Sequence, residues 1–319
     1  MTRSLSGLAA IALIAVLLAL AIGSVTIPPL ELWQVIQGEG SALNRTLIVD
    51  LRLPRTLAAF ATGGLLAVAG ALMQVLLRNP LADPYILGLS GGAAVGALLA
   101  MLAGLGTLLI SGSAFAGAML ATFLVFGLAH GTGSWTPTRL LLTGVVVAAG
   151  WGAVITLMLA VSPADQLPGM LYWLMGDVSY ARTPWPALVV LAVSIVLIMP
   201  LARNLNVLAR GPMQAAALGV SVRPLEWAVY LLASLLTATA VTTAGSVGFV
   251  GLIVPHMLRL VLGNDQRIIL PASALAGGTL LVLADTLART VIAPEQLPVG
   301  VITALLGVPM FLYLLHRSR

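Results

Sequence analysis

The sequence contains no cysteine and no lysine among its 319 residues. Without cysteine the chain can form neither disulfides nor a thiolate metal site. Without lysine it cannot carry the phosphate-binding loop G-x-x-x-x-G-K-[ST] of P-loop ATPases. Its three histidines, His130, His256 and His316, are far apart in the sequence, so we expect no metal site made from them.

Catalytic motifs are also missing. The sequence has no H-E-x-x-H, no G-x-S-x-G and no pair of neighbouring carboxylates that could act as general acid and base. We therefore predict that the chain is not an enzyme and that it holds no catalytic residue, no metal and no cofactor of its own. The chain would then transport a solute, conduct an ion or anchor another molecule.

Charged residues are scarce. They make up 8% of the chain, against 60% hydrophobic residues, and the mean hydropathy is +1.09. A soluble domain carries roughly a quarter charged residues, because water must wet its surface. The composition therefore excludes an ordinary soluble globule and predicts a protein surrounded by membrane lipid. The net charge of +5 comes from loop arginines, which we interpret as orientation signals and not as a nucleic-acid interface.

Long apolar runs fill most of the sequence, and each is about the length that a helix needs to cross a bilayer. They predict an all-α, polytopic membrane protein that forms a single transmembrane domain over residues 1–319. We expect the first run to be a retained span and not a cleaved signal peptide. The ten predicted spans cover about 5–26, 56–77, 86–105, 112–130, 139–161, 185–202, 224–244, 248–262, 270–292 and 299–315. We expect Pro255 and Pro309 to interrupt their helices, and paired glycines such as Gly63-Gly64 to allow close helix packing.

The arginines indicate an orientation. An even number of spans places both termini on one side of the membrane. If that side is the cytoplasm, ten of the fifteen arginines fall on the inner side. Because cytoplasmic loops carry an excess of basic residues, we predict cytoplasmic N- and C-termini.

Ionisable residues within the predicted spans are few. Asp285 and Arg289 have the i, i+4 spacing of neighbours on one helix face. They favour a local salt bridge, although a proton or cation site is the alternative. So sparse a set argues against one alternative, an ion-coupled secondary transporter or channel. A non-transporting membrane scaffold or receptor is the second alternative. A permease that draws energy from another protein fits better.

Two segments outside the spans are candidates for contact with other proteins: the outer segment 28–55 and the inner segment 203–223. Several strings then carry a resemblance across nearly the whole chain. They include LRLPRTL at 51–57, RNPLADP at 78–84, GFVGLIVPH at 248–256 and GVPMF at 307–311. The chain resembles the FecCD family of ABC importer permeases, which take up iron–siderophores, haem and cobalamin.

The resemblance implies an ABC type II importer fold in a bacterial cytoplasmic (inner) membrane, with alternating access along a dimer axis. It implies a second permease copy, as a homodimer or as paired homologous chains. It also implies two cytoplasmic ATPase subunits, which bind the ATP and Mg, and a periplasmic substrate-binding protein. The transported metal chelate is not specified by the sequence.

Individual positions can be matched to the family's motifs. Arg52, Arg55 and Arg289 match arginines that pair with glutamates of the binding protein; the alternative is that Arg52 and Arg55 anchor their helix at the headgroups. The segment 208–220 resembles the family's coupling helices, with Pro212 where the family has Glu. Proline suits a first helical turn, so we expect the helix to remain, while the contact of that Glu with the ATPase stays open. The implied coupling residues are Arg210, Gly211, Met213, Ala216, Ala217, Leu218 and Gly219.

Overall fold

The structure, a computed structural model, describes residues 2–130, 136–179, 181 and 183–317, and these form helices without any strand. Seven helical segments are long and apolar enough to span a membrane, and three shorter apolar helices accompany them. Each coincides with one of the ten predicted spans, which confirms the all-helical membrane fold. The ten are α1 (Thr2–Ala21), α4 (Leu53–Leu76), α5 (Leu89–Leu102), α6 (Thr107–His130), α7 (Pro137–Val161), α9 (Trp185–Ile198), α12 (Val222–Ala244), α13 (Val250–Leu262), α14 (Gln266–Ala288) and α15 (Val299–Arg317).

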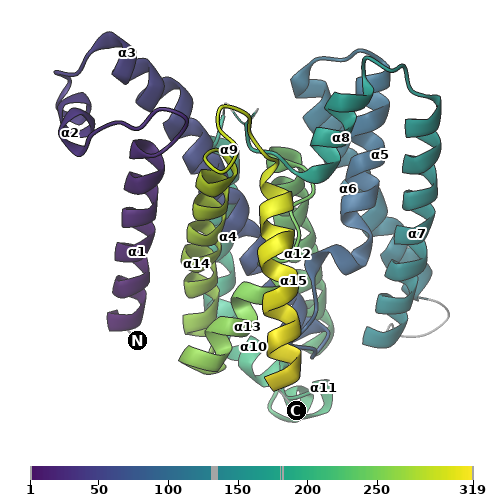
Figure 1. Ribbon diagram of the computed structural model, residues 1–319. Helices are drawn as coiled ribbons and strands as arrows, with labels where there is room; N and C mark the ends of the chain where they lie inside the picture. Colours follow the sequence, from purple (N-terminus) through teal and green to yellow (C-terminus); the bar gives the residue numbers. More distant parts are fainter. Residues whose placement is uncertain (1, 131–135, 180, 182, 318–319) are drawn as a thin grey trace.

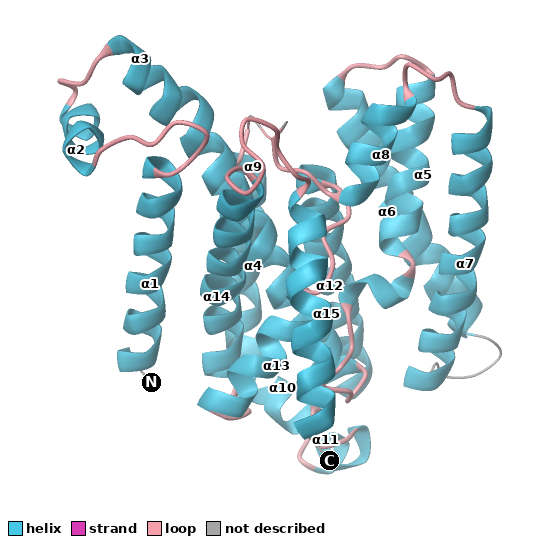
Figure 2. Cartoon of the chain, viewed as in Figure 1, coloured by secondary structure: helices cyan, strands magenta, loops and turns pink. Residues whose placement is uncertain are grey.

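Shorter helices lie between the spans (Figure 2). They are α2 (Pro29–Gln37), α3 (Ala42–Arg45), the π-helical stretch η1 (Thr46–Arg52), the 3₁₀ turns η2 (Pro84–Leu87) and η3 (Met199–Leu201), α8 (Leu167–Met175), α10 (Ala202–Leu208) and α11 (Pro212–Ala217). The π-helical turns of η1 join α3 to α4, so one helical run extends over residues 42–76. The sequence did not predict α8 or this continuity.

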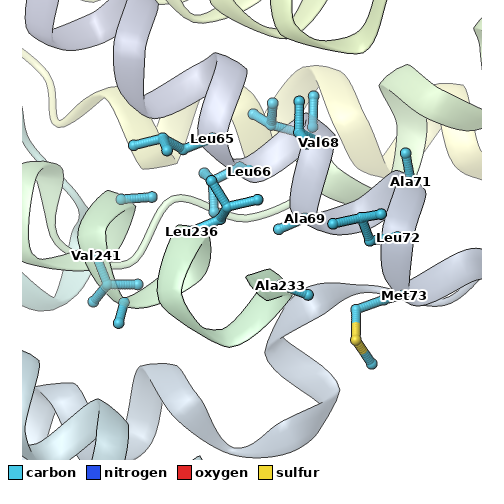
Figure 3. Close-up of a cluster of buried hydrophobic side chains, with 14 of the residues drawn as sticks. Leu65, Leu66, Val68, Ala69, Ala71, Leu72, Met73, Ala233, Leu236 and Val241 are labelled. Carbon is cyan, nitrogen blue, oxygen red and sulfur yellow. The ribbon is translucent and has the colours of Figure 1, made fainter. Parts of the chain in front are cut away.

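Helix α4 forms the centre of the bundle. It is the most buried of the long helices and packs against α14, α12 and α13. Figure 3 shows part of this core, where Leu66 of α4 lies beside Leu236 of α12. In contrast, α1, α6 and α7 are mostly exposed and apolar, so the surface they present suits lipid.

Glycines allow the central helices to approach closely. A Cβ added to Gly63 would lie 2.1 Å from the carbonyl oxygen of Gly277, and one added to Gly70 would lie 1.9 Å from that of Gly251. Either distance is far below van der Waals contact, so α4 meets α14 and α13 backbone to backbone. The predicted role of small residues in helix packing is confirmed at these crossings.

The prolines do not break their helices. We expected interruptions at Pro255 and Pro309, but α13 and α15 continue through them. Each proline removes one backbone hydrogen bond. Packing of the flanking turns against neighbouring helices maintains the helix, since Val254 and Pro255 are both buried in the bundle.

The two ends of the bundle differ. Figure 1 shows the start of α1 and the end of α15 at the same end of the bundle as α11, while α2 and α3 lie at the opposite end, above α1. The termini therefore share one side, as an even number of crossings requires. One end carries the beginning of α4 and the end of α14, and the other carries α10 and α11.

Candidate functional site

An arginine cluster occupies the end of the bundle where α4 begins and α14 ends. Arg55 contacts Asp285 with its Nε at 3.0 and 3.1 Å from the two carboxylate oxygens and its Nη2 at 2.8 Å from Oδ1. Its Nη1 donates to Oε1 of Gln296 at 2.6 Å. Because two of its nitrogens contact the carboxylate, this is a bidentate Arg–carboxylate pair, which is stronger and more directional than a single hydrogen bond. It joins residues 230 positions apart in the chain.

Asp285 also pairs with Arg289. The Nε of Arg289 lies 3.2 Å from Oδ2 of Asp285, at the i, i+4 spacing, which confirms the local salt bridge that the sequence favoured. The Asp285 side chain is 1% exposed. A single buried carboxylate thus lies between two guanidinium groups. Arginine nitrogens contact both of its oxygens.

Two arginines cap the end of α1. Arg52 donates through Nη1 to the carbonyls of Leu20 at 2.7 Å and Ala21 at 3.1 Å, and through Nη2 to that of Val25. Arg289 donates through Nη2 to the carbonyl of Ala19 at 3.2 Å. The last carbonyls of a helix have no partner within the helix, and cations favour that end of its dipole. The cluster therefore holds a lipid-exposed helix onto α4 and α14.

The structure brings the three predicted docking arginines together. Arg52 is 7% exposed and Arg289 is 5% exposed, and both guanidinium groups point into the protein. The Arg55 side chain is more accessible, at 12%. Docking through these residues stays a prediction. In the single chain, Arg52 and Arg289 stabilise the joint between α1, α4 and α14.

The predicted coupling segment lies at the opposite end of the bundle. Helix α11 begins at Pro212, as expected for proline in a first turn, and glycines with positive φ, Gly211 and Gly219, lie on either side of it. Met213 is 85% exposed and Leu218 is 70% exposed. The other coupling residues on the outer face of this segment, Arg210, Ala216, Ala217 and Gly219, are exposed as well. An apolar patch that projects from the end of a membrane bundle is typical of a protein contact.

The sequence reasoning missed one internal linkage, between Gln74 of α4 and Arg259 of α13. Arg259 donates to Oε1 of Gln74 and, at 3.3 Å, to the carbonyl of Ala71. Gln74 in turn donates to the carbonyl of Leu252 at 3.1 Å. These bonds satisfy a buried amide and fix the approach of α13 to α4. A lone glutamine in an otherwise apolar run was the signal that could have pointed to it.

The charged and amide side chains described above hold helices together and do not form a catalytic arrangement. Among the described residues, no three His, Cys, Asp or Glu side chains gather as a metal site. The polar groups are concentrated at the two ends of the bundle. The arginine cluster ties α1 to two central helices, and α11 presents a short apolar helix at the opposite end of the bundle.

Comparisons with known proteins agree with this architecture. The FecCD transport family matches residues 11–317. The chain is 44% identical to the cobalamin import system permease protein of Halobacterium salinarum, over 85% of this chain and 74% of that one. It is 41% identical to the hemin transport system permease protein of Yersinia pestis, over 85% of this chain and 83% of that one.

A solved structure shows the same fold. A metal-chelate type ABC transporter in an inward-facing conformation superposes with a TM-score of 0.88 at 30% identity, covering 99% of this chain and all of that one. The superposed length covers the segments of this chain that carry the arginine cluster and α11. The chain therefore belongs to the FecCD transport family of ABC importer permeases.

Proposed function

We propose that this permease carries a bulky metal chelate, such as an iron–siderophore, haem or cobalamin, into the cell. The observation that carries the proposal is the similarity over its whole length to a metal-chelate type transporter. The relatives named for cobalamin and for hemin support the same substrate class. They do not distinguish between its members, so the individual chelate is left to ligand-binding experiments with the partner binding protein.

The proposed assembly contains two copies of the permease, two cytoplasmic ATPase subunits that bind ATP and Mg, and one periplasmic binding protein. The exposed surface of α11 would transmit ATP-driven closure of the ATPases to the bundle. Met213 and Leu218 are its largest exposed apolar side chains. Burying such side chains supplies contact energy, while nearby arginines orient the partner.

The proposed orientation places α11 and both termini in the cytoplasm of a bacterial inner membrane. Because the chain has no cysteine, single-cysteine variants can test it without background labelling. A membrane-impermeant maleimide should modify Leu43→Cys in intact spheroplasts but should modify Met213→Cys only after lysis. Both parent side chains are well exposed, at 69% and 85%. The reverse pattern of labelling would contradict the orientation.

The assembly is tested by ATP hydrolysis in lipid nanodiscs. The complex of permease and ATPase should hydrolyse ATP faster when loaded binding protein is added. Arg55→Gln, which can still hydrogen-bond to Asp285, should weaken this stimulation in a salt-dependent way if Arg55 contributes to docking, since charges at an interface act mainly on encounter and orientation. A hydrolysis rate that does not change when the loaded binding protein is added would argue against an importer.

A further inference from the structure

A polar cavity opens at the end of the bundle that carries α11. Its volume is about 590 Å³, and it is bordered by the end of α4, the turn between α10 and α11, and the turn between α13 and α14. Its charged lining residues are Arg78, Arg210, Arg259 and Asp265. The other polar lining residues are the amides Gln74, Asn206, Asn264 and Gln266.

The only carboxylate in this lining is already compensated. Asp265 pairs with Arg267 at 2.6 Å and accepts a hydrogen bond from Asn206 at 2.9 Å. Arg259 donates only to neutral acceptors, Gln74 and the carbonyl of Ala71, so its positive charge is not cancelled. The cavity therefore presents a net positive charge to whatever enters it.

Arg78 is unusual in its backbone as well as its position. It follows the end of α4 with φ +49°, the left-handed region where glycine is the usual residue. Such a conformation is strained for a non-glycine residue, and residues held this way cluster at functional sites. Here the side chain reaches the coupling segment, since a Cβ added to Gly211 would lie 4.0 Å from Nη1 of Arg78. Glu226 of α12 interacts with both Arg78 and Arg223, so this single carboxylate offsets at most one of their two positive charges.

From these observations we infer that the cavity receives an acidic side chain of the partner ATPase, which Arg78 and Arg210 bind beside α11. The inference rests on the proposed function, because it assumes an ATPase at this end of the bundle. A carboxylate from the partner would complement the excess of guanidinium charge around the cavity.

The position of the cavity favours a protein over a lipid headgroup. It opens at the end of α4, the most buried of the long helices, and so lies near the middle of the bundle's cross-section. Lipid headgroups gather at the rim, next to exposed helices such as α1 and α7. Arg210 also directly precedes Gly211 and α11, the short helix at the far end of the bundle in Figure 1.

The test measures binding of the ATPase to permease in nanodiscs. The variant pairs Arg78→Gly with Arg210→Glu, because glycine suits the backbone of position 78 and should leave the fold intact. Arg139→Glu is the matched control, an exposed arginine at the same end of the bundle but outside the cavity. We expect the double variant to bind the ATPase about tenfold or more weakly at moderate salt, and the control to stay within about twofold.

Three results would overturn the inference. The first is equal affinity of the wild-type chain and the double variant. The second is an affinity of the wild-type permease for the ATPase that changes with the anionic lipid content of the nanodisc, together with a variant whose affinity does not change. The cavity would then hold a lipid headgroup. The third is wild-type permease that binds no ATPase, which would refute the proposed function itself. Normal wild-type assembly with an unaffected variant would refute only the cavity's role.

Discussion

Replacing Asp285 by Asn should be far more damaging than replacing Asp265 by Asn. Both carboxylates pair with an arginine, at 2.8 Å for Arg55–Asp285 and 2.6 Å for Arg267–Asp265. The first pair is buried, with side chains 12% and 1% exposed, while the second is 44% and 29% exposed. Asparagine keeps the shape and one oxygen acceptor, so the comparison isolates the charge.

The structure sets the expected magnitudes. Without the Asp285 carboxylate, the guanidinium groups of Arg55 and Arg289 remain close together and largely buried without a counter-charge. Removing one partner of a buried ion pair typically costs about 3–5 kcal/mol. An exposed pair is worth about 0–1 kcal/mol, and asparagine caps a helix as well as aspartate does, so α14 would keep its cap at position 265.

The assay is unfolding in mixed detergent–SDS micelles, followed by intrinsic tryptophan fluorescence at neutral pH. Asp285→Asn should lower the free energy of unfolding by about 3 kcal/mol or more, and Asp265→Asn by less than about 1 kcal/mol. Similar losses in the two variants would refute the reasoning. They would mean that the cluster contributes no more than a surface ion pair.

Three further predictions concern other parts of the molecule. Arg52→Ala should speed hydrogen exchange of backbone amides 22–27, because the end of α1 loses its cap; unchanged exchange would contradict the capping role. Gly63→Ala should reduce the yield of folded protein through a clash with α14, while Gly127→Ala, which meets no atom within 4 Å, should not. Burial raises the pKa of Asp83 to about 6. The folded state therefore keeps this proton longer than the unfolded state, so stability should fall as pH rises from about 4 to 6. Asp83→Asn should flatten that part of the pH–stability curve. An unaltered curve would show that Asp83 does not cause this pH dependence.

The spans could be predicted from the sequence because lipid imposes a simple rule on length and polarity. Each apolar run of about 20 residues became a helix, and even the shorter runs around Leu89–Leu102 and Val250–Leu262 were recognisable. The elements that were missed are short or irregular. Helix α8 is apolar but only nine residues long, too short to be recognised as a span. The π-helical join at η1 was missed because it extends the apolar helix α4 towards its beginning without a break.

The candidate sites were predictable in part. The i, i+4 pairing of Asp285 and Arg289 and the start of α11 at Pro212 follow from local helical geometry. The pairing of Arg55 with Asp285 joins residues 230 positions apart, and nothing in the local pattern encodes it. The capping of α1 by Arg52 likewise depends on how helices far apart in the sequence meet. A motif match could place this arginine near a surface, but it could not identify the α1 carbonyls to which Arg52 donates.

Uptake into proteoliposomes tests the central claim most directly. The permease is reconstituted with its ATPase, ATP is enclosed in the vesicles, and the loaded binding protein is added outside with a labelled metal chelate. The account predicts accumulation only when binding protein and ATP are both present. Accumulation by the permease alone, driven by a pH gradient, would contradict it.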